Sequence, residues 1–459
     1  MGKFIRTGFA MLTMMVGLGM AHVQADTLRQ VLVDAYRNSQ LLEQNRFLLR
    51  TNDENVTQAI SQLFPVINFT ASASRDLMND TLTNTASLVG QLVLYQGQQR
   101  RNAITAARET AAAARQQLVA LEQQILLDAV VAYLSVWRDM QVVRVNEANV
   151  RVINQQLRAA RDRFDVGEDT RTDVAQAEAQ LAEARSGQAA AQGALEISRE
   201  LFGLAVGRSP SALSGPGAMP TLPANQAEAE RLARETHPAI RAIQHQVTAA
   251  EAAVAQARGQ AAPTITLGAQ AAETFEHPSG PAFEGSSNTL SLTFTQPIYQ
   301  GGQIASLERQ AIAQVAATRS GLNQQALINL QTVGNAYAQL RIAQAQIAAS
   351  DQRIRAAELA LEGVTEEAAL GARTTLDVLD SEQDLLDARI GRIQAQADVF
   401  IAAYSVLAAS GLLTVSHLGL PVPEYDANAY AGAFDAGRPR VLSPRGERLD
   451  SVLSRIGRE

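Results

Sequence analysis

The sequence contains no cysteine among its 459 residues. This absence excludes disulfide bonds, thiolate metal ligands and cysteine catalysis. It also excludes anchoring through a lipid-modified cysteine at the start of the mature chain. After residue 25, no apolar run approaches the roughly 20 residues of a membrane-spanning helix. A membrane role therefore requires a β-barrel or an association with the membrane surface.

The sequence also lacks the motifs of common catalytic and metal sites. Its five histidines are scattered, and none has the spacing of a metal-binding motif. There is no glycine-rich phosphate loop and no G-x-S-x-G sequence. We therefore expect no enzyme, no metal site and no cofactor, and the net charge of −7 argues against nucleic acid as a partner. The histidines are His22, His237, His245, His277 and His417.

Residues 1–25 have the organisation of a secretory signal peptide. A positive region at Lys3 and Arg6 precedes an apolar run, residues 8–19, and we expect cleavage before Asp26. The apolar run is too short for a membrane span, and an uncleaved anchor helix is the alternative. Cleavage removes two cations and moves the net charge from −7 to −9. We expect the mature chain to leave the cytoplasm.

The remainder of the chain contains a long internal duplication. Tyr95-Gln96-Gly97 recurs as Tyr299-Gln300-Gly301, a shift of 204 positions (299 − 95). Pro65 pairs with Pro263 at a shift of 198, so the second copy has six extra residues before its Tyr-Gln-Gly (204 − 198). The shift of 204 also relates Ala132-Tyr133 to Ala336-Tyr337, Gly167 to Gly371, Thr170 to Thr374, Asp173-Val174 to Asp377-Val378, Glu178 to Glu382, Arg185 to Arg389, and Gly207 to Gly411.

Each copy repeats the same order of expected elements: a helix ended by a proline, a pair of strands, a very long helix, a glycine turn and a further helix. A proline-rich linker, residues 207–226, joins the copies, and residues 416–459 form a polar tail that we expect to be partly disordered. In residues 26–206 the expected elements are a helix from Thr27 to about Gln62, strands at about 64–96, and helices at 98–166 and 170–206. In residues 227–415 they are a helix from Ala227 to about Gln260, strands at about 263–298, and helices at 302–370 and 374–410.

The strand pairs alternate apolar and polar residues. Ile67 and Phe69, for example, alternate with Asn68 and Thr70. The alternation extends over about 9–11 residues, the length of a tilted strand that crosses a bilayer. For either pair alone, the alternative is an ordinary half-buried hairpin on a soluble core. Because four strands cannot close a barrel and open edges are not tolerated in lipid, the membrane interpretation requires an oligomer.

The long helices indicate an elongated molecule. All 14 prolines lie outside residues 66–209 and 298–420, and residues 98–166 contain no glycine either. A helix of about 69 residues is ~100 Å long, several times the diameter of a compact domain. We expect strands at one end of these helices and the glycine turns at the other. One coiled-coil-like apolar stripe consists of Leu118, Leu121, Ile125, Ala129, Ala132, Val136, Met140 and Val143.

Three groups of residues resemble the TolC family of outer-membrane efflux proteins, and the resemblance covers essentially all of residues 26–415. They are Arg163-Phe164-Asp165-Val166-Gly167 followed by Thr172-Asp173-Val174, Pro297-Ile298-Tyr299-Gln300-Gly301-Gly302, and Leu370-Gly371-Ala372-Arg373 followed by Asp377-Val378-Leu379-Asp380.

The resemblance implies a homotrimer in the outer membrane with a large periplasmic portion. Each protomer would give four strands to a twelve-stranded barrel and its helices to a periplasmic tunnel. A periplasmic adaptor protein and an inner-membrane transporter of the ABC or RND type would dock at the helical tip. The channel would be a passive exit for drugs, for a secreted protein, or for both.

The resemblance also implies a functional site at the two glycine turns. In the family, the positions of Thr172, Asp173, Arg373, Asp377 and Asp380 hold the periplasmic entrance closed and line it with acid. The turns themselves, at Val166, Gly167, Leu370 and Gly371, would contact the adaptor. A tyrosine that is frequent in the family's entrance network is replaced here by Ala368.

Two alternatives remain open from sequence. Asp173 and Asp377 stand near helix starts, where acidic residues commonly complement the helix dipole and have no further role. A periplasmic coiled-coil adaptor or a soluble helical scaffold is the alternative to the channel, although the tandem duplication argues against an adaptor.

Overall fold

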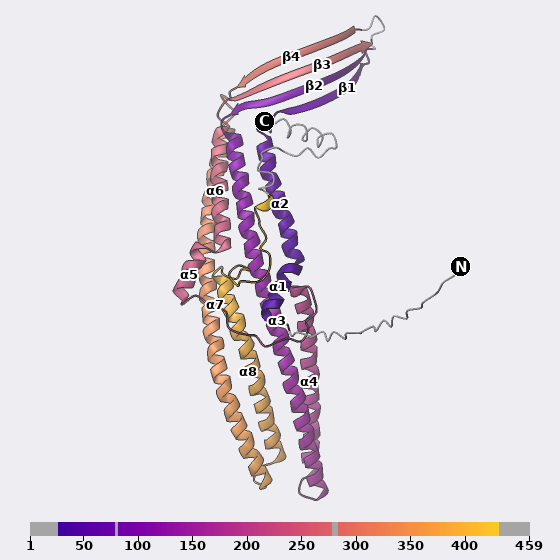
Figure 1. The fold of residues 1–459 in the computed structure, drawn as a ribbon, viewed down its shortest axis with the longest axis vertical. Helices are drawn as coiled ribbons and strands as arrows, with labels where there is room; N and C mark the ends of the chain where they lie inside the picture. Colours follow the sequence, from indigo (N-terminus) through magenta and orange to yellow (C-terminus); the bar gives the residue numbers. More distant parts are fainter. Residues whose placement is uncertain (1–25, 79–80, 278–282, 431–459) are drawn as a thin grey trace, which may run out of the picture.

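The computed structural model describes residues 26–78, 81–277 and 283–430. Figure 1 shows an elongated molecule with the strands at one end and two helical hairpins projecting away from them. The first half comprises α1 (Leu28–Asn38), α2 (Gln40–Ser61), β1 (Val66–Asp76), β2 (Thr81–Gln96), α3 (Gln99–Asp165) and α4 (Arg171–Val206). The second half comprises α5 (Gln226–Glu235), α6 (Pro238–Gly259), β3 (Thr264–His277), β4 (Phe283–Thr295), α7 (Gln303–Ala369) and α8 (Thr375–Ala409).

This order of elements confirms the expected α+β fold, in which two similar units each supply two strands and a very long helix. The signal peptide expected at residues 1–25 and the end of the expected tail, residues 431–459, lie outside the described residues.

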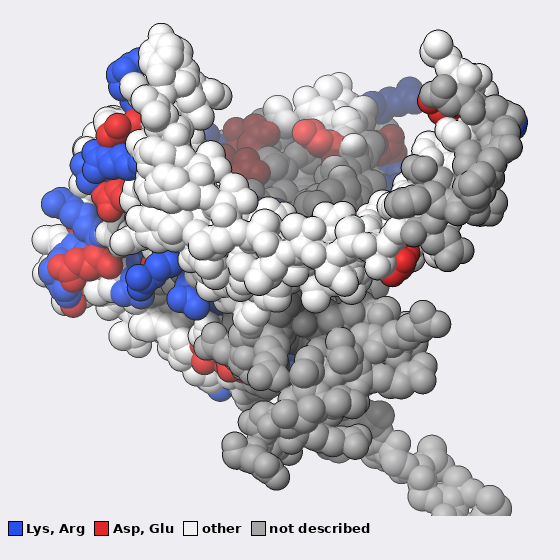
Figure 2. Space-filling view, turned by 90° about the horizontal axis from the view of Figure 1, so that it is seen from above, with Lys and Arg blue, Asp and Glu red and all other residues white. Residues whose placement is uncertain are grey.

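The strands form one antiparallel sheet in the order β1-β2-β3-β4, so the hairpins of the two halves join through β2 and β3. Ile67 lies opposite Gly90, Gly90 opposite Ala269, and Ala269 opposite Leu290. Because side chains alternate along a strand, this register collects the apolar positions on one face of the sheet. Seen from the strand end, the curved wall of the sheet is almost uncharged (Figure 2).

Three of the four strands exceed the length read from sequence. β1 to β4 contain 11, 16, 14 and 13 residues, against an expected 9–11. In β2 the register shifts between Val93 and Tyr95. Such a bulge inserts one residue and breaks the strict alternation by which a strand is recognised in sequence. The bulge therefore explains the imperfect alternation near the end of β2.

α3 and α7 are helices of 67 residues each and form the axis of the two halves. By composition, one 18-residue window of α3 is apolar enough to cross a membrane, which corrects the expectation that no such segment follows residue 25. Half of that window is buried inside the protomer, where α3 packs against α4, α6 and α8. Its apolar character is therefore that of a core helix. Of the expected stripe, Leu118, Ile125, Ala129, Ala132, Val136 and Val143 are buried, and Leu121 and Met140 pack against the same cluster.

Each copy's first helical segment, expected as one helix, is two helices. In the first half Ser39 interrupts the segment, and its hydroxyl accepts from the Leu42 N–H at 3.2 Å to cap α2. In the second half Pro238 takes the first position of α6, capped by His237. The two breaks lie at equivalent places, since 237 − 39 is the shift of 198. The capping side chains of Ser39 and His237 therefore start a new helix within a segment whose residues otherwise favour one continuous helix.

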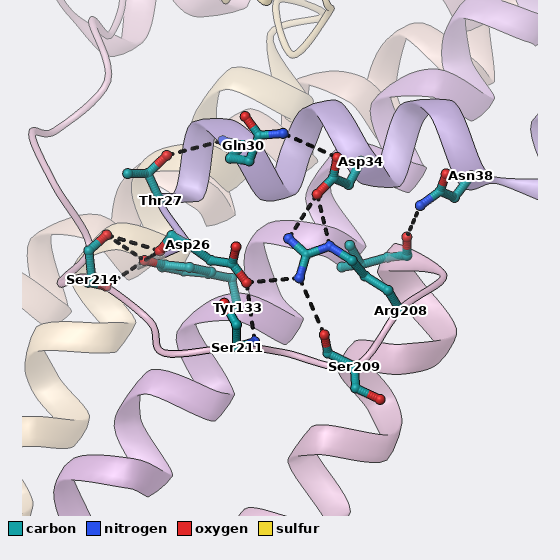
Figure 3. Close-up of polar contacts among 11 residues, drawn as sticks. Asp26, Thr27, Gln30, Asp34, Asn38, Tyr133, Arg208, Ser209, Ser211 and Ser214 are labelled. Atoms are coloured by element: carbon teal, nitrogen blue, oxygen red, sulfur yellow. Dashed lines mark hydrogen bonds and ion pairs between the residues drawn. The ribbon is translucent and has the colours of Figure 1, made fainter. Parts of the chain in front are cut away.

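The linker between the halves is held by two tyrosines that the duplication relates. The Tyr133 side chain is fully buried, and its hydroxyl is within hydrogen-bonding distance of backbone oxygens of Asp26 and of the first half of the linker (Figure 3). Tyr337 donates to the Pro223 carbonyl, near the other end, at 3.2 Å. The partners of Tyr133 are the carbonyl oxygens of Asp26, Ser214 and Gly215.

An ion-pair cluster fixes the start of the linker to the first helix (Figure 3). The Arg208 guanidinium donates to the Asp26 and Asp34 carboxylates, each at 2.8 Å. Burial of the Asp26 carboxyl tends to raise its pKa, but hydrogen bonds from Arg208 and Ser211 outweigh this and lower the pKa. These contacts hold the linker, residues 207–226, against the helices, and it is called the belt below.

Residues 416–430 do not form the polar tail that the sequence indicates. Leu420 belongs to the main apolar core, and Arg29 donates to backbone carbonyls at residues 418 and 419. The Arg46 guanidinium lies 5.3 Å from the Tyr36 ring and 4.7 Å from the Tyr425 ring. This segment is a strap over α1–α3. It has no helical or strand period, which explains why a search for periodic patterns misses it.

Candidate functional site: the two helical tips

The two long hairpins end in turns of the same design. Gly167 and Gly371 have φ values of 89° and 75°, in the left-handed region that favours glycine. The Glu168 N–H donates to the Arg163 carbonyl, and the Ala372 N–H donates to the Glu367 carbonyl, both at 2.9 Å. These bonds satisfy carbonyls at the ends of α3 and α7 and turn the chain into the next helix.

Asp173 and Asp377 close a capping box at the start of α4 and α8. The Asp173 carboxylate accepts from the Thr170 N–H at 2.8 Å, and the Asp377 carboxylate accepts from the Thr374 N–H at 2.9 Å. Hydrogen bonds from Thr170 and Thr374 lower the pKa values of Asp173 and Asp377 respectively, so both stay ionised at neutral pH. Both aspartates thus have the helix-start role that the sequence left open.

Arg373 makes its ion pair with a residue that the sequence reading did not single out. Its Nε lies 2.8 Å from a Glu367 carboxylate oxygen, across its own turn. The positive charge of Arg373 also helps to lower the pKa of Asp377, but its ion pair is with Glu367. Thr172 and Asp380 are exposed on α4 and α8. The structure therefore brings Arg373 to its own turn and leaves Asp380 open to solvent.

The two tips carry the same ion pair with its charges exchanged. In the first tip the Arg163 Nε lies 2.9 Å from an Asp169 oxygen. The shift of 204 places Arg163 on Glu367 and Asp169 on Arg373. Both pairs bridge six residues across a turn, with the cation first in one tip and the anion first in the other. A search for identical residues in the two copies misses this pair, because the charges are exchanged. Comparing charged positions in the two copies finds it.

The apolar residues of the turns face outward. Val166 is 72% exposed and Leu370 is 87% exposed. Within the described residues, no group of three or more His, Cys, Asp or Glu side chains is arranged to hold a metal ion.

Comparisons with known proteins agree with this architecture. The family model described as outer membrane efflux protein matches residues 31–208 and 230–412. The outer membrane efflux protein BepC of Brucella suis is 37% identical over 404 residues, which cover 87% of this chain and 89% of BepC. The alkaline protease secretion protein AprF of Pseudomonas aeruginosa is 25% identical over 334 residues, or 69% of this chain and 66% of AprF.

A solved structure of CusC, in a study of transmembrane channel formation, has the same fold. It superposes with a TM-score of 0.76 at 18% identity and covers 84% of this chain and 92% of CusC. Proteins named TolC are among the other relatives, so the resemblance read from the tip and Tyr-Gln-Gly motifs is confirmed. The chain belongs to the outer membrane efflux protein family, and its place is the outer membrane, with a large periplasmic portion.

Proposed function

We propose that three copies of this chain form a channel-tunnel that gives passive exit to substrates delivered from the inner membrane. The observation that carries the proposal is the sheet, in which β1 and β4 are edge strands and one face is apolar. Edge strands in lipid leave backbone groups unsatisfied, at a cost of several kcal/mol each. Pairing β4 of one copy with β1 of the next closes the sheet into a twelve-stranded barrel and removes every edge.

The helices offer matching surfaces for the same ring. On one side a groove of about 620 Å³ is lined by α1–α4 residues that include Leu201 and Leu204, and Leu204 is 84% exposed. On the other side α7 exposes Leu327 and Ile328. The shift of 204 matches these two to positions 123 and 124 of α3, within one turn of Ile125 in the groove. Rotation about an axis along the helices does not change the position of a residue along that axis. Leu327 and Ile328 of one copy would therefore meet the groove of the next copy.

The assembly is tested by extracting the outer membrane in detergent and separating unheated samples by electrophoresis. We expect a heat-sensitive trimer band, and we expect Leu204→Gln and Leu327→Gln each to convert most of it to monomer. Leu370→Gln is the control, because Leu370 is as exposed as Leu204 but lies at a tip. A soluble monomer in the periplasm would overturn the channel proposal and favour a scaffold.

We place the channel entrance at the tips. In a ring, Asp173, Asp377 and Asp380 would form circles of carboxylates that favour cations. Asp380 gives the cleanest test because, unlike Asp173 and Asp377, it is not in a capping box. Asp380→Asn is expected to reduce cation selectivity, measured as the reversal potential in planar bilayers under a salt gradient. Glu235→Gln on α5, far from the tips, is the control.

The proposed partners follow from the same surfaces. The outward-facing turns at Val166–Gly167 and Leu370–Gly371 would receive a periplasmic adaptor, and an inner-membrane transporter of the ABC or RND type would load the channel. One relative is named for efflux and another for secretion of a protease, so drugs and a secreted protein both remain candidates. Crosslinking of the complex in its own cell identifies the transporter.

A further inference from the structure

The backbone N–H, the backbone carbonyl and the carboxylate of Asp26 are all bound in the folded chain. The N–H donates to the Ala212 carbonyl at 2.7 Å, and the carbonyl accepts from the Ser214 N–H at 3.0 Å. These two bonds make a short parallel bridge between residue 26 and the belt. The carboxylate accepts from the Arg208 guanidinium at 2.8 Å and from the Ser211 N–H at 3.2 Å (Figure 3). The belt and Arg208 therefore hold residue 26 through each of its polar groups.

Asp26 is also the residue that the sequence predicts to become the N-terminus of the mature chain. Hydrolysis of the bond between residues 25 and 26 consumes one water and leaves a carboxylate on residue 25 and an α-ammonium on Asp26. The nitrogen that donates to the Ala212 carbonyl then carries a positive charge, and a charged donor makes a stronger hydrogen bond than a neutral amide. The next residue, Thr27, already caps α1 by accepting from the Gln30 N–H at 3.2 Å. No free segment therefore separates the new terminus from the fold.

The charges around Asp26 favour a cation at this position. The Arg208 guanidinium is shared by the carboxylates of Asp26 and Asp34, each at 2.8 Å, so this cluster has one positive and two negative charges, a net charge of −1 (1 − 2). The α-ammonium brings its net charge to zero (2 − 2). The carboxylate side chains are only 12% and 19% exposed, so solvent screens the added charge less than it would on an open surface.

We propose that the belt and Arg208 form a binding site for the mature N-terminus, which holds the α-ammonium and the carboxylate of the processed Asp26. The ligand is a free N-terminal aspartate, supplied by the same chain. Capture of a terminal amine by backbone groups is an established mode of peptide recognition, and the arginine adds a charged partner for the side chain. Removal of the signal peptide then strengthens the attachment of the first residue to the linker between the two copies. This assignment does not depend on the channel proposal.

The sequence allows the terminus to be probed by itself. No lysine follows Lys3, so the α-amino group of Asp26 is the only primary amine of a chain processed at this site. An N-hydroxysuccinimide ester therefore reports on one position, and the intact mass shows first where the chain begins. We expect the folded protein in detergent to be labelled about tenfold more slowly than the protein in urea, because local opening must release the amine. A mature chain that begins at another residue would overturn the proposal.

Two arginine variants test the contribution of the guanidinium. Arg208→Gln removes the contacts to Asp26 and Asp34, and labelling of the folded protein should become about threefold faster or more, because loss of a hydrogen bond to a charged group makes local opening easier. Arg199→Gln is the matched control, because Arg199 lies shortly before Arg208 in sequence and pairs with Glu196 instead. It should keep the wild-type rate. Equal rates in the two variants would overturn the assignment of Arg208.

An insertion keeps the test valid if Arg208→Gln does not fold. A Ser-Gly pair inserted between residues 25 and 26 moves the amine out of the site and leaves residues 26–430 unchanged in sequence. We expect the folded insertion variant to be labelled at the rate seen in urea. The same labelling rate for the folded wild type and the insertion variant would overturn the proposal, and so would the same rate for the wild type in detergent and in urea.

Discussion

The crossing of two glycines beneath the sheet gives the most decisive test of the fold. Gly97, just before α3, has φ 52°, and a Cβ added there would stand 2.5 Å from the Gly259 carbonyl oxygen and would overlap the Ala262 Cβ. Gly259, at the end of α6, has a helical φ, and its added Cβ would stand 2.5 Å from the Gly97 carbonyl oxygen. Gly301, the counterpart of Gly97, has φ 58° and nothing within 4 Å of its added Cβ.

Three alanine substitutions therefore separate backbone strain from steric overlap. Gly301→Ala carries only the left-handed backbone strain, worth about 1–2 kcal/mol. Gly259→Ala carries only the overlap, which forces α3 and α6 apart and costs about 1–3 kcal/mol. Gly97→Ala carries both, so we expect it to lose about 2–5 kcal/mol, close to the sum of the other two.

The assay is the urea midpoint of the detergent-solubilised protein at constant m-value, so that a shift of the midpoint reports a change in stability. Gly301→Ala is also the control for any effect of an added methyl group in the Tyr-Gln-Gly motif. Equal midpoints for Gly97→Ala and Gly301→Ala would refute the reasoning, because they would mean that the crossing helices absorb the methyl group without cost.

Two further predictions concern the belt and the pH response. Tyr133→Phe should cost about 1–3 kcal/mol, because the Tyr133 side chain is fully buried and its hydroxyl bonds to the linker are lost. Tyr337→Phe loses one bond at a half-exposed side chain and should cost about 1 kcal/mol. Equal urea midpoints for the two variants would contradict this. Burial lowers the pKa of His237, with its hydrogen bond to the Ala408 backbone opposing, and its neutral Nδ1 accepts from the Ala239 N–H at 3.2 Å. The pKa of His237 is higher in the unfolded chain, about 6.5, than in the folded one. Its contribution to folding stability is therefore complete above that pH and is lost as the pH falls through the pKa of the folded state. Asparagine can cap α6 but does not titrate. The urea midpoint of His237→Asn should therefore fall less between pH 8 and pH 5 than that of the wild type. Identical pH profiles would exclude His237 as the cause.

Much of the fold is predictable because the duplication repeats its signals. Proline positions, strand alternation and the glycine turns occur twice in the same order, and each copy supports the interpretation of the other. The breaks at Ser39 and His237 escape prediction because single residues with capping side chains decide them, against a background of good helix formers. The 416–430 strap escapes because its contacts are long-range and aperiodic.

At the tips, sequence reasoning finds the two glycine turns and misses one ion pair. It places Asp173 and Asp377 at the helix starts, where the structure puts them in capping boxes. It places Arg373 in the entrance set with Asp377 and Asp380, and it does not find the ion pair of Arg373 with Glu367, six residues before. A turn brings the residues on its two sides together, so an ion pair across it depends on the turn's geometry and not on the spacing of a helix face.

The strap has a consequence for the order in which this chain reaches its final state. Leu413, Val415 and Leu420 share one core with Leu28 and Val31, near the start of the described chain. β2 of the first copy also pairs along its length with β3 of the second. The first copy therefore cannot complete its core while it emerges alone, although it repeats a whole structural unit. Completion of this core therefore requires residues 413–420, which are synthesised after both copies of the structural unit.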